Sequence, residues 1–188
     1  MSHLHLISSR PSVGQEDFGK QVDHPSLEGY QREFAYLIRT LRRLGVPRSD
    51  LEDVAQEVFI VLHHTWEKYD PARPLRAYIF GIAFRVSRNH ARKGRREVPH
   101  AVMNVCDGAL HPDQTLEAKQ VRALVLRALD RVPLSRRAVL IMHDIDKLPM
   151  GEIASTLSIY RFTGYSRLRK ARQEFAAAVG SLRGAGEA

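Results

Sequence analysis

Apolar side chains recur at intervals of three and four residues along most of this chain, and this spacing is the feature that most restricts its fold. Such a period places apolar residues on one face of an α-helix, whereas a half-buried strand needs alternation with a period of two. Few segments alternate in that way. Nine prolines, at positions 11, 25, 47, 71, 74, 99, 112, 133 and 149, separate the periodic segments. We therefore predict an all-α fold.

The periodic segments predict two groups of helices. The first group is expected at 28–45, 50–68 and 75–95, and the second at 115–131, 135–145, 149–157 and 160–179. In the first helix, the buried stripe is expected to hold Phe34, Leu37, Ile38, Leu41 and Leu44. Prolines, a glycine and the absence of periodicity are typical of a linker between the groups. We predict two small helical domains, 28–98 and 115–179, with a flexible linker at 99–114 and tails at 1–27 and 180–188.

The charge of the chain is unevenly distributed. The formal net charge is +8, but residues 73–99 hold eight cations and one acidic residue, whereas residues 1–72 have a net charge of −3. A second basic segment, residues 158–188, holds six cations and two acidic residues. Two separate basic segments favour a polyanionic partner, with nucleic acid preferred to an anionic membrane.

Several other classes of protein do not fit this sequence. No apolar run reaches the 18 residues of a membrane span, and the N-terminus lacks the basic start and apolar core of a signal peptide. The single cysteine, Cys106, excludes an intramolecular disulfide, and with His100 and His111 it lacks a fourth metal ligand. Motifs of phosphate-binding loops, zinc proteases and serine hydrolases are absent. We expect a cytoplasmic protein that is not an enzyme and has no metal site and no cofactor.

The last two predicted helices have the spacing of a helix-turn-helix. The second of them is expected to bury Leu168, Ala171 and Phe175 on one face. Its outward face then carries Thr163, Ser166, Arg167 and Lys170. Hydroxyls and cations on one exposed face suit phosphate and base-edge contacts in a major groove. The solvated face of a helix in a bundle would show the same pattern.

Two further helix faces are candidates for binding. The third helix carries a basic ridge of Arg85, Arg88, Asn89, Arg92 and Lys93. Cations near aromatic residues suit single-stranded nucleic acid, although core packing explains Trp66 and Tyr78 equally well. The second helix carries one acidic and amphipathic face, with Asp53, Gln56, Glu57, Ile60 and His63. This face predicts a basic protein surface as its partner, unless it is only solvated.

Together these segments resemble a known family. The stretch DLEDVAQEVFIVLHHTWEKYDP, followed by PLRAYIFGIAFRVSRNHARKGRR, resembles region 2 of the sigma-70 family of bacterial RNA polymerase sigma factors. The stretch LDRVPLSRRAVLIMHDIDKLPMGEIASTLSIYRFTGYSRLRKAR resembles region 4. The short linker between them leaves no room for a region 3 domain. This arrangement is similar to the extracytoplasmic-function (ECF, group 4) sigma factors.

The resemblance implies a factor that binds core RNA polymerase and promoter DNA, while the polymerase performs the catalysis. Binding to the β′ clamp helices of polymerase is implied for Asp53, Gln56, Glu57, Phe59 and His63. A contact of the protein with the β flap of polymerase is implied as well. Melting of the −10 element, with a flipped base held by a loop, is implied for Tyr69, Arg73, Arg76, Tyr78, Arg85, Arg88, Asn89, Arg92 and Lys93. Docking of the −35 duplex is implied for Thr163, Tyr165, Ser166, Arg167, Arg169, Lys170 and Arg172.

The resemblance also implies an anti-sigma factor as an additional partner. Two alternatives to this function stay open at the level of the sequence. One is a stand-alone helix-turn-helix regulator that binds duplex DNA without polymerase. The other, more distant, is a structural RNA-binding helical protein.

The sequence departs from the family's pattern in the helix-turn-helix. The turn that the family writes as G-I-P-x-G-T-V reads here as SIYRFTG, so Ser158 replaces the turn glycine and Gly164 replaces the inward valine. Glycine in a helix interior costs about 1 kcal/mol, and the lost burial of a valine costs about 1.5–3 kcal/mol more. We predict that the region 4 unit is weakly folded alone and that Gly164→Val would stabilise it.

Overall fold

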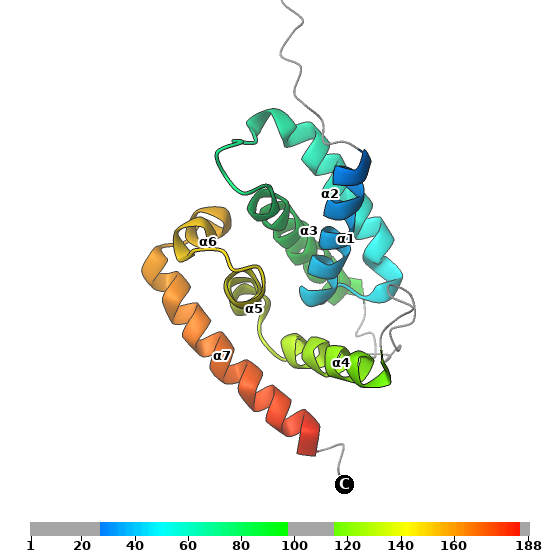
Figure 1. Ribbon diagram of the computed structural model, residues 1–188, viewed down its shortest axis with the longest axis vertical. Helices are drawn as coiled ribbons and strands as arrows, with labels where there is room; N and C mark the ends of the chain where they lie inside the picture. Colours follow the sequence, from blue (N-terminus) through cyan, green and yellow to red (C-terminus); the bar gives the residue numbers. More distant parts are fainter. Residues whose placement is uncertain (1–26, 98–114, 185–188) are drawn as a thin grey trace, which may run out of the picture.

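The computed structural model describes residues 27–97 and 115–184, and every regular element in these two ranges is helical (Figure 1). The all-α fold is therefore confirmed. The N-terminal unit comprises α1 (Leu27–Arg43), α2 (Leu51–Thr65) and α3 (Leu75–Glu97), with short 3₁₀ turns η1 (Arg48–Asp50) and η2 (Trp66–Lys68). The C-terminal unit comprises α4 (Leu116–Asp130), α5 (Leu134–Leu140), the π-helical turn η3 (Ile141–Ile145), α6 (Met150–Leu157) and α7 (Arg161–Gly184).

The predicted linker, nearly all of the predicted N-terminal tail and the last four residues of the predicted C-terminal tail lie outside the described residues. These are residues 1–26, 98–114 and 185–188, and they include His100, Cys106 and His111. The predicted domain boundaries therefore stay a prediction. In the described ranges, no helix is long and apolar enough to cross a bilayer.

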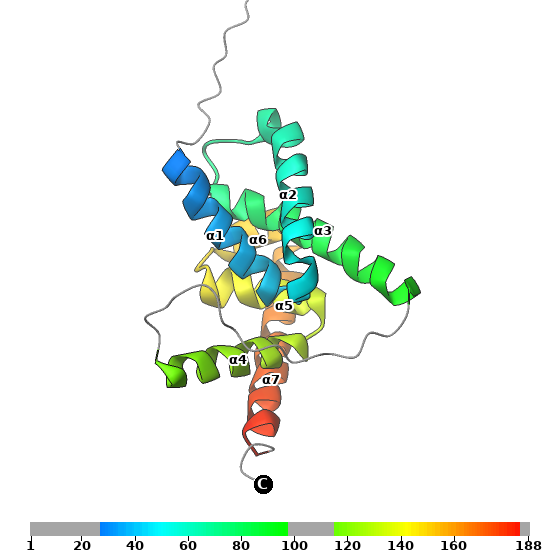
Figure 2. The ribbon, with the colours of Figure 1, turned by 90° about the vertical axis from the view of Figure 1, so that its right-hand side faces the viewer.

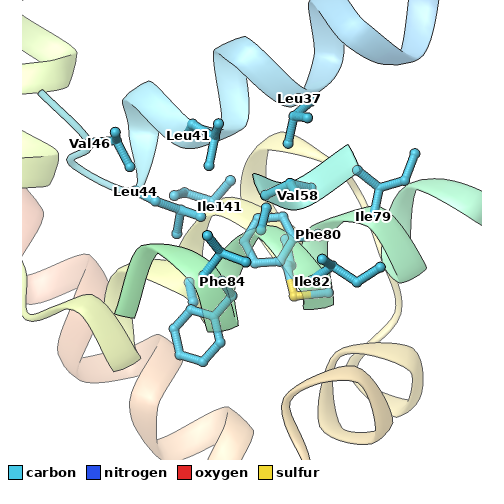
Figure 3. Close-up of a cluster of buried hydrophobic side chains, with 14 of the residues drawn as sticks. Leu37, Leu41, Leu44, Val46, Val58, Ile79, Phe80, Ile82, Phe84 and Ile141 are labelled. Carbon is cyan, nitrogen blue, oxygen red and sulfur yellow. The ribbon is translucent and has the colours of Figure 1, made fainter. Parts of the chain in front are cut away.

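Buried apolar side chains of both units form one continuous core. In the N-terminal unit α3 packs against α1 and α2, and its Phe80 and Ile82 are fully buried. Ile141 of η3 is also fully buried and lies among Leu44 and Phe80 of the N-terminal unit (Figure 3). Burial of one such side chain contributes about 1.5–3 kcal/mol. The sequence pattern predicts two small cores, and it does not reveal that they merge into one.

A buried polar contact joins the two units beside this core. The phenol of Tyr36 in α1 donates a 2.7 Å hydrogen bond to Asp146, which follows η3. Arg43 lies 3.8 Å from the same carboxylate, and the guanidinium of Arg76 lies 5.2 Å from the centre of the Tyr36 ring. Burial, and then the charge of Asp146, hold the pKa of the Tyr36 phenol well above its ordinary value. The phenol therefore stays protonated and remains a donor at physiological pH.

A second junction between the units depends on Gly45, which follows α1. Its φ of +90° is a conformation that L side chains rarely adopt. The buried guanidinium of Arg137 in α5 occupies the space where a Cβ would stand. Arg137 itself donates to the Asp130 carboxylate at 2.9 Å and to the Val132 carbonyl at 3.0 Å. A glycine at position 45 thus lets the end of α1 approach the buried guanidinium of Arg137, which is held by its hydrogen bonds to the more exposed Asp130 and to Val132.

The last helix is longer than its sequence pattern predicts. The periodicity predicts an end at residue 179, followed by a frayed tail, but α7 continues to Gly184. The physical reason is a small second cluster, in which Ala178 and Leu182 are buried against Ala128 of α4. In Figures 1 and 2, α7 extends along the C-terminal unit, and its far end reaches past α4.

Replacement of Gly45 by alanine tests the second junction. We expect Gly45→Ala to lower the free energy of unfolding by about 1–3 kcal/mol, because it strains the backbone and displaces the Arg137 guanidinium. Urea unfolding of the full chain measures this loss. The matched control is Gly180→Ala in α7, where nothing lies within 4 Å of an added Cβ, so the change is expected to stabilise by about 0.5–1 kcal/mol. Equal changes in the free energy of unfolding for the two variants would contradict the close contact assigned to Gly45 and Arg137.

Candidate nucleic-acid interface

The outer face of α2 presents acidic and polar side chains to solvent. Asp53, Gln56, Glu57 and His63 are all exposed, as their shared helix face predicts. Phe59 differs, because it is half-buried and its ring stacks on that of Phe34 in α1, with centroids 5.7 Å apart. The acidic face therefore borders an apolar patch that includes Ile60, which is 52% exposed.

Phe34 corrects one expectation from the sequence. The pattern places it on the buried stripe of the first helix, yet it is 46% exposed. In the remainder of that stripe, Leu37, Leu41 and Leu44 are buried as predicted, whereas Ile38 is half-buried. Phe34 lies one helical turn before the main core, where it covers Phe59 instead. Its exposure, which periodicity alone does not indicate, adds it to the candidate protein-binding face of α2.

The basic ridge of α3 is exposed along its length. Arg85, Arg88, Asn89, Arg92 and Lys93 are all solvent-accessible, whereas Ile82 and Val86 on the opposite face are buried. The four cations make no ion pair with any residue in the described parts of the chain. An unneutralised row of cations on a rigid helix suits the phosphates of a nucleic acid.

Three aromatic residues, two before α3 and one in its first turn, brace the loop that precedes α3. The ring of Tyr69 lies between those of Trp66 and Tyr78, with centroids 5.3 and 5.2 Å away. The Tyr69 phenol donates to the Arg73 carbonyl at 2.9 Å, and the Tyr78 phenol donates to the Thr65 carbonyl at 2.6 Å. Burial, and then Asp70, raise the pKa of the Tyr69 phenol. Tyr69 and Tyr78 thus hold the loop in shape.

Arg73 and Arg76 do not lie on the exposed ridge in this arrangement. The Arg73 guanidinium donates to the Glu152 carboxylate in α6, at 3.1 and 3.2 Å. Arg76 lies over the ring of Tyr36 and 3.8 Å from Glu33. Both cations therefore make contacts within the protein, and Arg73 links the N-terminal unit to the helix-turn-helix. A role for them on DNA stays a prediction.

In α7 the structure divides the predicted DNA-facing residues into two groups. Tyr165, Arg169, Lys170 and Arg172 are exposed. Thr163, Ser166 and Arg167 are half-buried, and thus lie at the edge of the packed face. The predicted inward face is confirmed for Leu168 and Ala171, which are buried, while Phe175 is half-buried.

Arg172 is engaged within the protein. Its guanidinium forms two hydrogen bonds to Asp144 of η3, at 2.6 and 2.9 Å. These bonds, helped by His143, lower the pKa of the Asp144 carboxyl to about 2. The positive charge at the end of the predicted −35 set is therefore offset, whereas the exposed Arg169 and Lys170 form no ion pair with any residue that the structure describes.

The unusual turn of the helix-turn-helix has a specific geometry. Ser158 ends α6 with φ 54° and ψ 51°, the left-handed conformation that glycine adopts most easily. Gly164 is buried, and Met150 of α6 fills the space where its Cβ would stand. This contradicts the expectation that valine would stabilise position 164. The glycine permits close approach of α6 and α7, and Met150 supplies the apolar packing.

No group of three or more His, Cys, Asp or Glu side chains in the described ranges is arranged to hold a metal ion. The side chains of His90 and Asp50, with 3.1 Å between Nε2 and Oδ2, instead connect α3 to the start of α2.

Comparison with known proteins shows that this chain is similar to sigma factors of RNA polymerase. A family model of sigma-70 region 2 matches residues 30–97. The RNA polymerase sigma factor CnrH of Cupriavidus metallidurans is 26% identical over 183 residues, which cover 88% of this chain and 96% of that protein. The ECF RNA polymerase sigma-E factor of Escherichia coli is 24% identical over 155 residues, covering 77% of this chain and 79% of that protein.

A solved structure has the same fold. It is the sigma factor RpoE of Bartonella quintana, crystallised in complex with the anti-sigma factor NepR. The superposition has a TM-score of 0.63 at 16% identity and covers 82% of this chain and 98% of that one. At this identity the likeness establishes the fold.

Substitutions at the turn test its geometry. We expect Ser158→Gly to raise the free energy of unfolding by about 1 kcal/mol, because glycine relieves the left-handed strain. Ser155→Gly, an exposed position inside α6, is the matched control and is expected to cost about 0.5 kcal/mol. Urea unfolding of the full chain measures both. Two destabilising changes of equal size would contradict the strained turn.

Because Met150 occupies the space beside Gly164, a larger side chain at this position is predicted to lower the free energy of unfolding, whereas the sequence alone predicts an increase. We expect Gly164→Val to destabilise the full chain by about 1–3 kcal/mol, because buried Met150 must move. Thermal and urea unfolding measure the change. A variant as stable as the parent, or more stable, would show that Met150 can be displaced at no cost.

The pKa of Asp144 predicts a pH dependence. A carboxyl whose folded-state pKa is lowered adds stability that is fully present above its unfolded pKa of about 3.9. That stability is lost as the pH falls toward the folded pKa of about 2. The stability difference between the parent and Asp144→Asn should therefore shrink between pH 5 and pH 2 in urea unfolding. The control is Glu67→Gln, at an exposed position without an ion pair in the described residues, and it should show no such trend. A stability difference between the parent and Asp144→Asn that stays constant with pH would exclude this linkage.

Proposed function

The chain belongs to the sigma-70 family, in its extracytoplasmic-function group, and from this membership we propose that it binds core RNA polymerase and directs promoter recognition, −10 melting and transcription initiation. The observation that carries the proposal is the match to region 2 over residues 30–97. This segment contains both the acidic face of α2 and the basic ridge of α3. In this function the catalysis of RNA synthesis belongs to the polymerase, and the place of action is the cytoplasm.

The acidic face of α2 is the proposed contact with the β′ clamp helices of polymerase. Asp53, Gln56 and Glu57 are exposed on a helix whose opposite face, with Val54 and Val58, is buried in the core. A rigid helix with exposed carboxylates beside the Phe34–Phe59 stack offers charge together with apolar area. This combination suits a basic protein surface better than a nucleic acid, whose phosphates the carboxylates would repel.

The ridge of α3 is the proposed contact with the −10 element. Its unpaired cations can neutralise phosphates of a separated strand, and a base can be held near the aromatic loop before α3. A −10 role for Arg73 further requires its release from Glu152, because the guanidinium is engaged by α6 in this arrangement. Promoter binding through Arg73 therefore requires this partly exposed ion pair to open.

The exposed face of α7 is the proposed reader of the −35 duplex, in the major-groove position of a second helix in a helix-turn-helix. Its exposed cations include Arg169 and Lys170, which make no ion pair within the described ranges. We also propose contact with the β flap of polymerase and control by an anti-sigma factor. Support for the latter comes from a structural relative, RpoE, which was crystallised with its anti-sigma factor NepR.

A stand-alone helix-turn-helix regulator is not favoured. Such a regulator would use α6 and α7 for duplex DNA, but it would give no role to the acidic face of α2. It would also leave the match to sigma-70 region 2 unexplained.

Reconstituted transcription tests the proposed function. Core RNA polymerase with the full chain should initiate at a promoter selected from genomic DNA, and the double change Asp53→Ala with Gln56→Ala should reduce initiation at least tenfold. The reason is that both side chains lie at the centre of the proposed polymerase contact, where truncation of one residue can cost about 2 kcal/mol or more of binding free energy.

The control for this experiment is Glu67→Gln, an exposed acidic position outside that face. It should leave initiation unchanged. Promoter binding without core polymerase, unaffected by the double change, would support the stand-alone regulator and exclude the sigma-factor function.

A further inference from the structure

Three large aromatic side chains are exposed at the start of the recognition helix α7. Tyr160 is 86% exposed, Phe162 is 85% exposed and Tyr165 is 58% exposed. They belong to the junction of α6 and α7, and this junction lies at the outer edge of the molecule in Figure 1. Aromatic residues that gather on a surface commonly mark a binding site, because contact of their large apolar area with water is unfavourable.

The packing of α7 decides which way these residues face. Gly164, Leu168 and Ala171 are buried toward the rest of the C-terminal unit. Positions 162 and 165 lie on the other side of the helix, on the same face as Arg169, three and four residues apart. In a helix-turn-helix, the N-terminal residues of the second helix are those that reach base edges in the major groove. Phe162 and Tyr165 therefore occupy the reading position.

The surrounding charge favours DNA as the occupant. From Tyr160 to Arg172 the chain carries five cations and no acidic residue. Arg169 and Lys170 are exposed beyond the aromatic residues, whereas Arg172 is offset by Asp144. Cations further along the helix can reach phosphates while the start of the helix enters the groove.

The apolar character of the reading position then restricts the base. In the major groove, the only apolar group on a base edge is the 5-methyl group of thymine. We propose that Phe162 and Tyr165 contact thymine methyl groups and so select for thymine in the −35 duplex. This inference rests on the proposed function and adds Phe162 to the specificity-determining residues.

Removal of the methyl group alone tests the inference. A duplex is selected from a random pool by the full chain with core polymerase, and it is resynthesised with deoxyuridine at one thymidine at a time, which leaves base pairing unchanged. Each methyl group in contact should be worth about fourfold in affinity. The parent should lose this factor at one or two positions, and Phe162→Ala should bind the thymidine and deoxyuridine forms equally at one of them.

Phe162 is suited to this substitution because its exposure leaves little packing to lose. The matched control is Leu116→Ala, an exposed apolar residue of α4, which should keep the parent's discrimination. Equal binding of all thymidine and deoxyuridine duplexes by the parent would overturn the inference, leave the sigma-factor function intact, and assign the aromatic residues to a protein contact. Discrimination unchanged in Phe162→Ala would overturn the role of Phe162. A chain that selects no duplex with polymerase would contradict the proposed function itself.

Discussion

The buried hydrogen bond from Tyr36 to Asp146 is the interaction on which the arrangement of the two helical units depends. It joins α1 to the residue after η3, and Arg43 and Arg76 offset the buried charge from the N-terminal side. A buried carboxylate is costly without partners, and here the side chains that contact it, Tyr36 and Arg43, belong to the other unit. Separation of the units would therefore expose Asp146 and Ile141 together.

This arrangement has a consequence for the candidate surfaces. The acidic face of α2, the ridge of α3 and the start of α7 all point to solvent, so all three are available while the units are packed. Arg73 and Arg76 are the exceptions, because each is used in a contact with another part of the protein. The pair between Arg73 and Glu152 is partly exposed and weak, at about 0–1 kcal/mol. The core around Ile141 and the Tyr36 contact hold the units far more strongly.

The sequence predicts the local features of this protein and misses the long-range ones. Periodicity locates each helix, because burial of one face leaves a regular pattern, and exposed cations such as Arg88 follow from the same pattern. The merging of the cores and the partners of Arg73 depend on contacts between residues about 80 positions apart, for which periodicity carries no signal. The effect of Gly164 on stability is also misjudged from the sequence, because Met150 fills the space beside it only after α6 and α7 have packed. Phe34 is misjudged because the stripe of α1 extends beyond the core.

A double-mutant cycle on Tyr36→Phe and Asp146→Asn tests the central claim most directly. The free energy of unfolding is measured in urea for the full chain, for each single variant and for the double variant. Because the two side chains form one buried hydrogen bond, the effects should be non-additive by about 1–3 kcal/mol. Additive effects, within about 0.3–0.5 kcal/mol, would mean that this contact does not hold the two units together.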